Sequence, residues 1–304
     1  MSTPSGARRL LTTSEGLNRG DFTARDWTLF VSISLIWGSS FLLMAIGLEA
    51  FEPGLITLLR VGLGAGALWL APQARANRIA RIDWPRLVAL SFVWVAIPFT
   101  LFPIAQQHIN SAVTGMLNGA MPIFAAVIAI AMLGRLPSGR TIVGLVVGFG
   151  GVVAISLPSI GEGSSEALGV ALVVLATACY GLAVNMAAPI QQKYGSIPVM
   201  ARMLALATLW TAPFGLIGAT ESSFAWGPFL AVAGAGVVGT GIAFVVMGSL
   251  VGRVGSTRAS FITYVIPVVA VVLGVVFLGD EVTPLALVGT ALVIGGALLA
   301  SRRD

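Results

Sequence analysis

Few side chains in this sequence have the chemistry of a catalytic or metal site. Its 304 residues include one cysteine, Cys179, and one histidine, His108. A zinc site built from cysteine and histidine needs about four such ligands, and a disulfide needs two cysteines. The sequence therefore excludes both features, and we expect no catalytic residues, no metal site and no cofactor.

Polar and aromatic side chains near the middle of long apolar stretches are better candidates for function. Polar groups inside a bilayer must find partners in the protein or in a water-filled cavity. We predict a small-molecule cavity with aromatic faces for an apolar group, and with amides and hydroxyls for an amino or carboxylate group. The alternative is that these polar groups link helices by hydrogen bonds. The candidates are Trp37, Ser40, Trp94, Asn118, Tyr180, Asn185, Phe244, Thr263 and Tyr264.

Two prolines, Pro122 and Pro267, also stand within apolar stretches. Each removes one helix donor and clashes with the carbonyl four residues earlier, so we expect a kink at both. The kinks are either hinges for a conformational change or static bends that shape the helix bundle.

Two arginines, Arg60 and Arg202, stand near the ends of apolar stretches. A long basic side chain at such a depth can reach the lipid headgroups, and we favour a structural role of this kind for both. The alternatives are a cap on the carbonyl end of a helix and an anchor for a carboxylate.

The composition is that of a membrane protein. Apolar residues make up 57% of the chain and charged residues only 10%, and the mean hydropathy is +0.97. Soluble domains carry about 45–50% apolar and about 25% charged residues. These values exclude an ordinary cytosolic enzyme, a disordered protein and a nucleic-acid-binding protein.

Ten stretches are apolar and long enough to cross a bilayer, which takes about 20 residues. We therefore predict an all-α polytopic membrane protein with ten transmembrane helices, preceded by a polar tail at residues 1–26. The predicted spans are 27–49, 54–71, 85–105, 109–133, 140–157, 166–189, 198–219, 226–250, 256–278 and 283–301.

The basic residues predict the orientation of these spans. Apart from Arg60 and Arg202, every lysine and arginine lies in a terminus or in every second loop, and the other loops carry only acidic charges. Because basic loops stay in the cytoplasm, we expect both termini there. This bias also explains the net charge of +5 without nucleic acid as a partner.

The two halves of the sequence resemble each other at an offset of about 145 residues. Since each half has five predicted spans, the second must be inverted relative to the first, an arrangement typical of secondary transporters with a site near the midplane. We predict one five-helix repeat at residues 27–157 and its inverted copy at 166–301. The matched positions include Trp37 with Tyr180, Arg60 with Arg202, Ser111 with Ser256, Asn118 with Thr263, Pro122 with Pro267, Gly144 with Gly289, and Gly150-Gly151 with Gly295-Gly296.

Several of these motifs form a wider pattern that covers residues 27–301. They are Trp37-Gly38-Ser39-Ser40, Arg60, the mid-span prolines and the segment 278–284, Leu-Gly-Asp-Glu-Val-Thr-Pro. In this pattern the chain resembles the EamA family of the drug/metabolite transporter superfamily. It departs from the family at Arg135-Leu136, where an acidic residue often follows glycine.

The resemblance implies a multi-pass protein of the bacterial inner membrane that exports amino acids or related metabolites, with aromatic amino-acid exporters closest in kind. It also implies a cavity between spans 1, 3, 4, 6, 8 and 9, with spans 5 and 10 outside it. Small-residue spacing at Gly144 and Gly148 allows close helix packing within a monomer, and a homodimer through spans 5 and 10 stays open.

Other functions stay open as alternatives. The substrate could be a drug, a nucleotide sugar or an organic cation. A membrane enzyme acting on lipids would need clustered carboxylates or histidines, and a channel usually has polar or charged rings; the sequence has neither. All 12 acidic residues stand in predicted loops or termini, so we expect no proton antiport through a carboxylate buried in the membrane.

Overall fold

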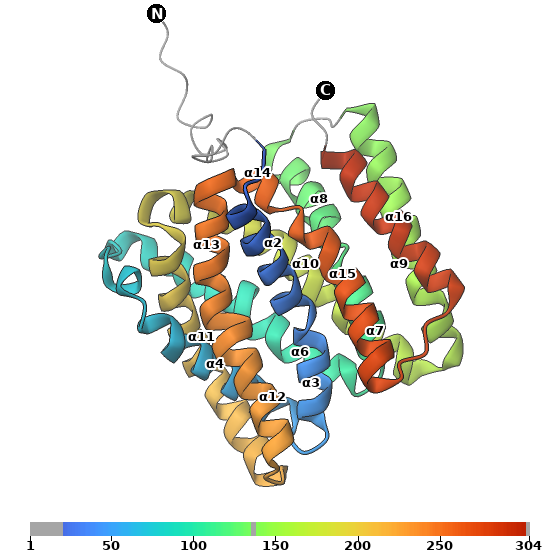
Figure 1. The fold of residues 1–304 in the computed structure, drawn as a ribbon, viewed down its shortest axis with the longest axis horizontal. Helices are drawn as coiled ribbons and strands as arrows, with labels where there is room; N and C mark the ends of the chain where they lie inside the picture. Colours follow the sequence, from blue (N-terminus) through green and yellow to red (C-terminus); the bar gives the residue numbers. More distant parts are fainter. Residues whose placement is uncertain (1–20, 135–137, 302–304) are drawn as a thin grey trace, which may run out of the picture.

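The computed structural model describes residues 21–134 and 138–301, and within them every regular element is helical (Figure 1). The predicted tail up to residue 20, Arg135, Leu136 and the basic residues Arg302 and Arg303 lie outside the described residues. In chain order the helices are α2 (Ala24–Gly38), α3 (Ser40–Leu48), α4 (Pro53–Trp69), η1 (Pro72–Arg75), η2 (Arg81–Asp83), α5 (Trp84–Leu90), η3 (Ser91–Ala96), α6 (Ile97–Gln106), α7 (Ser111–Asn118), α8 (Met121–Leu133), α9 (Gly139–Glu162), α10 (Ser164–Tyr194), α11 (Ser196–Glu221), α12 (Trp226–Gly236), η4 (Val237–Ile242), α13 (Ala243–Val254), α14 (Ser256–Ala259), α15 (Ile262–Leu273), η5 (Gly274–Leu278) and α16 (Pro284–Ser301).

Eight helical segments of the described chain are long and apolar enough to cross a membrane. Two shorter apolar helices, Pro53–Trp69 and Ile262–Leu278, coincide with the other two predicted spans. The multi-pass all-α prediction is therefore confirmed. The eight long segments are Ala24–Leu48, Arg81–Gln106, Ser111–Met132, Gly139–Ser159, Ser164–Tyr194, Ser196–Glu221, Trp226–Val254 and Pro284–Ser301.

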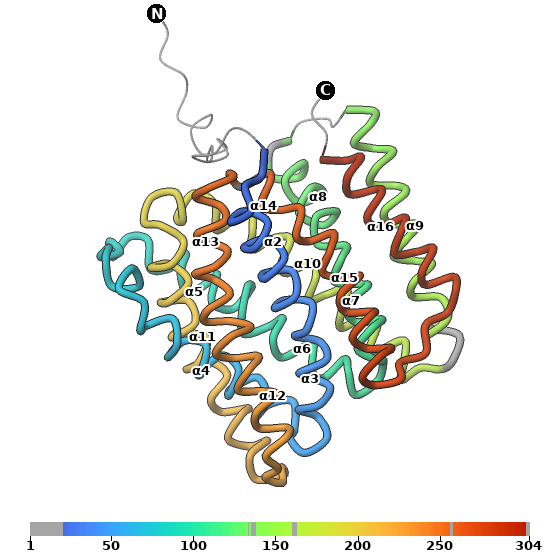
Figure 2. Tube along the Cα trace, viewed as in Figure 1, coloured from blue at the N-terminus to red at the C-terminus, as the bar shows by residue number. Residues whose placement is uncertain are grey.

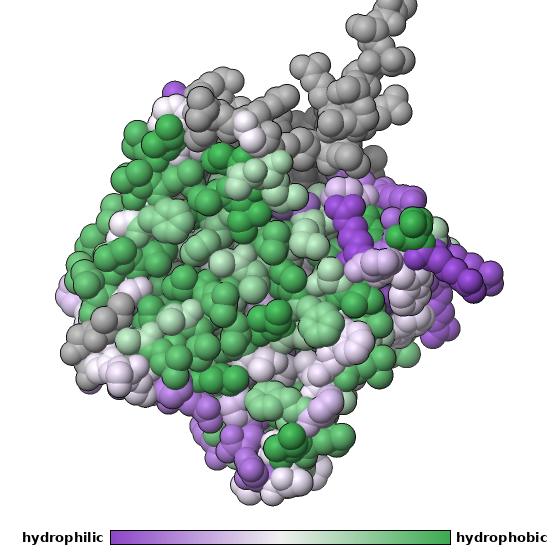
Figure 3. All heavy atoms as spheres, turned by 180° about the vertical axis from the view of Figure 1, so that it is seen from behind, coloured by the Kyte–Doolittle hydropathy of each residue, from purple (hydrophilic) through white to green (hydrophobic). Residues whose placement is uncertain are grey.

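Large hydrophobic side chains cover much of the surface, as a lipid environment requires. Figure 3 shows a broad hydrophobic face, with hydrophilic residues gathered toward its margins. Exposed examples are Val146 on α9, Leu216 on α11 and Val288 on α16. Since a water-soluble monomer rarely exposes apolar patches this large, these faces are suited to contact with acyl chains.

The chain begins and ends its helices at one end of the bundle, where α2 starts and α16 finishes (Figures 1 and 2). Turns at the opposite end are held together by hydrogen bonds between distant parts of the chain. The Ser223 N–H donates to the Ala50 carbonyl at 3.0 Å, and the Asn110 amide donates to the Glu281 carbonyl at 3.0 Å.

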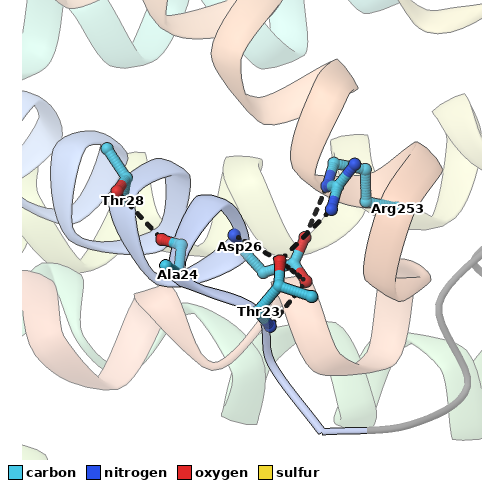
Figure 4. A network of polar contacts seen from close by, with 5 residues as sticks. All are labelled: Thr23, Ala24, Asp26, Thr28 and Arg253. Atoms are coloured by element: carbon cyan, nitrogen blue, oxygen red, sulfur yellow. Dashed lines mark hydrogen bonds and ion pairs between the residues drawn. The ribbon is translucent and has the colours of Figure 1, made fainter.

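A buried carboxylate fixes the start of α2 (Figure 4). Asp26 is fully buried. It accepts hydrogen bonds from the Thr23 N–H at 2.9 Å and the Thr23 hydroxyl at 2.7 Å, and it pairs with Arg253 on α13. A buried charge is stable only when it is paired and hydrogen-bonded, so this contact joins α2 firmly to α13.

Several of the membrane-crossing segments are interrupted rather than straight. The segments η3, η4 and η5 are π-helical, and α2 is separated from α3 at Ser39. Pro98 is the second residue after η3 and cannot donate a backbone hydrogen bond, which accounts for the irregular turn before it. Such π-helical turns are frequent at functional sites.

Helices α9 and α16 cross at glycines so closely that there is no room for a side chain. A Cβ atom on Gly296 would lie 2.5 Å from the Gly144 carbonyl oxygen, and one on Gly289 would lie 2.7 Å from the Gly151 carbonyl oxygen. The predicted close packing at Gly144 thus occurs within the monomer. Next to Gly296, Gly295 faces open space.

Adding one methyl group at each of the neighbouring glycines Gly295 and Gly296 should affect stability differently. We expect Gly296→Ala to destabilise the protein by about 1–3 kcal/mol because it overpacks the crossing. Gly295→Ala should leave stability unchanged or slightly raise it, since alanine is the better helix former. Thermal unfolding of both variants in detergent, followed by tryptophan fluorescence, measures the difference; equal melting temperatures would contradict the tight crossing.

Candidate functional site

A cavity of about 150 Å³ lies between the helices of the two halves of the sequence. It is lined by α2, α3, α4, η3, α6, α7, α8, α10, η4, α13 and α15, and none of its lining residues comes from α9, α11 or α16. The lining residues are Trp37, Ser40, Phe41, Met44, Arg60, Trp94, Phe99, Phe102, Asn118, Met121, Tyr180, Val184, Gly239, Thr240, Phe244, Thr263 and Ile266.

Seven of the nine predicted site residues share this cavity. They come from six of the ten predicted spans, so the structure brings together positions up to 226 residues apart along the chain. They are Trp37, Ser40, Trp94, Asn118, Tyr180, Phe244 and Thr263.

The other two candidates, Asn185 and Tyr264, do not line the cavity. The Asn185 amide donates to the carbonyls of Ala125 and Gly181, both at 2.9 Å, so it links α10 to α8. The Tyr264 ring lies 6.0 Å from the Phe261 ring, centroid to centroid. A depth count along the sequence cannot distinguish the cavity side of a helix from its packing side.

Seven of the 17 lining residues carry aromatic rings. Trp37 and Phe244 meet edge to face with centroids 6.1 Å apart, and the Phe102 ring lies 5.7 Å from that of Tyr180. Paired rings of this kind hold one another in place, so the wall offers a firm apolar surface to a ligand.

The serine and threonine hydroxyl groups of the lining already donate to nearby backbone carbonyls. Ser40 donates to the Ile36 carbonyl at 3.4 Å, Thr240 donates to the Ala235 carbonyl at 3.0 Å, and Thr263 to that of Ser260 at 2.8 Å. Because each proton is used, these hydroxyls present oxygen lone pairs to the cavity. They can accept hydrogen bonds from a ligand but are not free to donate them.

Prolines stand four residues after four of the lining residues, Trp94, Phe99, Asn118 and Thr263. A proline has no N–H to donate to the carbonyl four residues earlier, so it removes the regular helical bond of each of these carbonyls. For Phe99 the Thr57 hydroxyl replaces it, donating at 2.9 Å. Pro122 and Pro267 therefore loosen the backbone beside the cavity at two repeat-related positions.

Arg60 differs most from its expected place. It stands near the middle of α4 and is only 6% exposed, and it lines the cavity. Its guanidinium carbon lies 4.3 Å from the centroid of the Phe99 ring, and Nη1 lies 3.1 Å from the Met44 sulfur. The interpretation as a headgroup-reaching arginine is wrong for this residue, because neighbouring helices cover it.

Glycines explain why Arg60 is covered. A Cβ atom on Gly64 of α4 would lie 2.8 Å from the Thr240 Cβ, and one on Gly236 would lie 2.9 Å from the Arg60 carbonyl oxygen. The missing side chains let α12 and η4 lie directly against α4. The sequence contains these glycines, but their facing positions appear only in the fold.

The repeat-related arginine, Arg202, has a different environment. Its guanidinium donates to the carbonyls of Ala74 at 3.0 Å, Pro198 at 2.9 Å and Asn77 at 2.9 Å. It therefore caps backbone carbonyl groups, which was one of the two alternatives to the favoured headgroup-reaching role.

Two polar atoms of the cavity residues have no hydrogen-bond partner in the described structure, Nε of Arg60 and Oδ1 of Asn118. Leaving a buried donor or acceptor unpaired costs about 1–3 kcal/mol, and more when the group is charged. Both atoms are closed off from solvent, and both belong to residues that line the same cavity.

Carboxylates do not contribute to the cavity lining, and residues 21–134 and 138–301 contain no group of three or more potential metal ligands. His108 lies away from the cavity and shares a hydrogen bond with the Ser165 hydroxyl at 2.8 Å. The residues missed by the sequence analysis are mainly apolar: phenylalanines, methionines, Val184 and Ile266. Their residue types do not distinguish a cavity wall from ordinary packing.

Thiol accessibility tests the cavity directly. On a Cys179→Ser background, we expect Asn118→Cys and Thr263→Cys to react with a small water-soluble thiol reagent, because both positions line the cavity. Thr177→Cys is the control, since Thr177 is fully buried on α10 away from the lining. Mass spectrometry of the folded protein in detergent measures labelling; equal rates at all three positions would contradict the cavity.

Comparison with known proteins gives the family. The model of the EamA-like transporter family matches residues 27–157 and 167–302. A probable terminal-alkyne amino-acid exporter from Streptantibioticus cattleyicolor is 27% identical over 91% of this chain and 93% of its own length. An uncharacterized transporter from Archaeoglobus fulgidus is 23% identical over 92% of this chain and 99% of its own.

A solved crystal structure has a similar fold, with a TM-score of 0.61 at 19% identity over 92% of this chain and 97% of that one. At that level of identity the likeness concerns the fold alone. The family match covers both halves of the chain and agrees with the resemblance seen in its motifs. The chain therefore belongs to the EamA-like transporter family.

Proposed function

We propose that this protein is a secondary transporter of the bacterial inner membrane that exports amino acids or similar small metabolites. The observation that carries the proposal is the aromatic, partly polar cavity enclosed by both halves of a chain from a transporter family. The likeness to a probable amino-acid exporter supports this class of substrate.

The proposed architecture is ten spans arranged as two inverted five-helix repeats, residues 27–157 and 166–301. Close contacts that occur in pairs related by the sequence offset support it. A Cβ on Gly38 would lie 2.5 Å from Val269, and one on Gly181 would lie 2.8 Å from Phe124. Gly38 corresponds to Gly181, and Phe124 to Val269, so the two crossings are copies of one contact.

The crossing of α9 and α16 has the same property. Gly144 meets Gly296, and Gly151 meets Gly289; an offset of 145 residues exchanges the two contacts. A pair of contacts that map onto each other in this way is expected at a pseudo-two-fold axis between inverted repeats. This supports a site placed on or near that axis.

Alternating access in this proposal moves the repeats about the cavity. Pro122 and Pro267 are its proposed hinges, since both weaken the backbone next to lining residues. The contact that would have to open at the outer end is formed by Asp280, which accepts from the Ser111 hydroxyl at 2.7 Å and the Ala112 N–H at 2.8 Å.

Both termini are proposed to lie in the cytoplasm. On a Cys179→Ala background, we expect Gln73→Cys to react with an impermeant thiol reagent only after the membrane is opened, because it lies in a basic loop. Ser164→Cys should react in intact cells. Both positions are exposed in the structure, so the reverse pattern of labelling would overturn the topology rather than reflect burial.

Transport is proposed to need no proton antiport through a buried carboxylate, since no carboxylate lines the cavity. Proteoliposomes loaded with a labelled amino acid, with neither a pH gradient nor a potential, should release it faster than protein-free liposomes. Sugars and organic cations serve as the comparison substrates.

Each failure of this experiment has its own meaning. Efflux that begins only when a proton gradient is imposed would contradict the coupling proposal but keep transport. Release of sugars or cations without amino acids would contradict the substrate class, and no release of any compound would contradict the transport function.

A further inference from the structure

We propose that Arg60 is the fixed cation of the cavity and binds the carboxylate of the transported molecule. This inference rests on the proposed transport function and narrows its substrate class to apolar carboxylic acids, with amino-acid zwitterions as the main case.

The first argument is the missing counter-charge. Arg60 is 6% exposed, and no carboxylate of residues 21–134 or 138–301 forms an ion pair with it. An unpaired charge within a membrane protein is costly and usually faces a cavity or a partner. A substrate anion in the adjoining cavity would be that partner.

The second argument is the set of groups that Arg60 already contacts. They are the face of the Phe99 ring and the Met44 sulfur, a weak acceptor. A guanidinium has five N–H donors in a planar fork that matches a carboxylate. Its present partners leave most of that donor capacity for a ligand, and its Nε has no partner at all.

The third argument is the complementary character of the remaining wall. The Ser40, Thr240 and Thr263 hydroxyls donate to backbone carbonyls, so their oxygens act as acceptors toward the cavity, which suits an ammonium group. The paired aromatic rings suit an apolar side chain. Together these groups match the three parts of an apolar amino acid: carboxylate, ammonium and side chain.

The fourth argument is the contrast between the repeat-related arginines. Arg202 donates to three backbone carbonyls, so helix capping accounts for its charge. Arg60 caps no carbonyl among the described residues and lines the cavity. Arg202 therefore provides a matched control, a second arginine at the equivalent position whose charge does not face the cavity.

The test compares an amino acid with the amine that remains after loss of its carboxylate. Leucine and isopentylamine, or phenylalanine and phenethylamine, compete against labelled substrate in proteoliposomes. We expect the amino acid to compete roughly ten- to hundredfold better in the wild type, the range of a hydrogen bond to a charged group. In Arg60→Gln this preference should fall to near onefold, and Arg60→Lys should restore part of it.

The control variant Arg202→Gln should keep the wild-type ratio even if it lowers the amount of folded protein. The inference is overturned if the wild type does not prefer the acid over the amine, a result that needs no variant to fold. It is also overturned if Arg60→Gln transports with an unchanged preference. A wild type that transports none of these compounds would instead contradict the proposed function.

Discussion

The structure depends on the absence of water in the bilayer core, which obliges polar groups to find partners inside the protein. Most hydroxyls in the helices comply within their own turn. Thr57, Ser156 and Thr177, for example, each donate to the carbonyl four residues earlier, at 2.7–2.8 Å. Against this background, three buried side-chain atoms of the described residues lack a partner, one each on Arg60, Gln106 and Asn118, and two of these residues, Arg60 and Asn118, line the cavity.

Close packing and irregular helices both occur in this fold. Glycines bring α9 against α16 and α4 against η4 until their backbones nearly touch, which makes these contacts tight and short. Around the cavity, by contrast, prolines remove helical hydrogen bonds and π-helical turns widen the backbone. The tight crossing of α9 and α16 away from the cavity, together with irregular helices beside it, is compatible with a site that changes shape while its supports stay fixed.

The sequence predicted the helical class, the positions of the helices and the family, because apolar length, basic loops and a few motifs are local properties. It also predicted most polar and aromatic members of the cavity. It did not predict which face of a helix points inward, and so Asn185 and Tyr264 were placed in the site. Arg60 was misread for a related reason. The position of Arg60 along its helix suggests that its side chain reaches the headgroups. In the fold, the neighbouring glycines allow α12 and η4 to cover this side chain instead.

The central claim is that a carboxylate-bearing molecule occupies the cavity beside Arg60. The most direct measurement is a cryo-electron microscopy structure of the protein in nanodiscs, saturated with an amino acid that it transports. We expect density for the ligand within the ring of Trp37, Phe102 and Phe244, with its carboxylate about 3 Å from the guanidinium. A ligand bound elsewhere, or an Arg60 side chain turned away from the cavity toward lipid headgroups, would contradict the account.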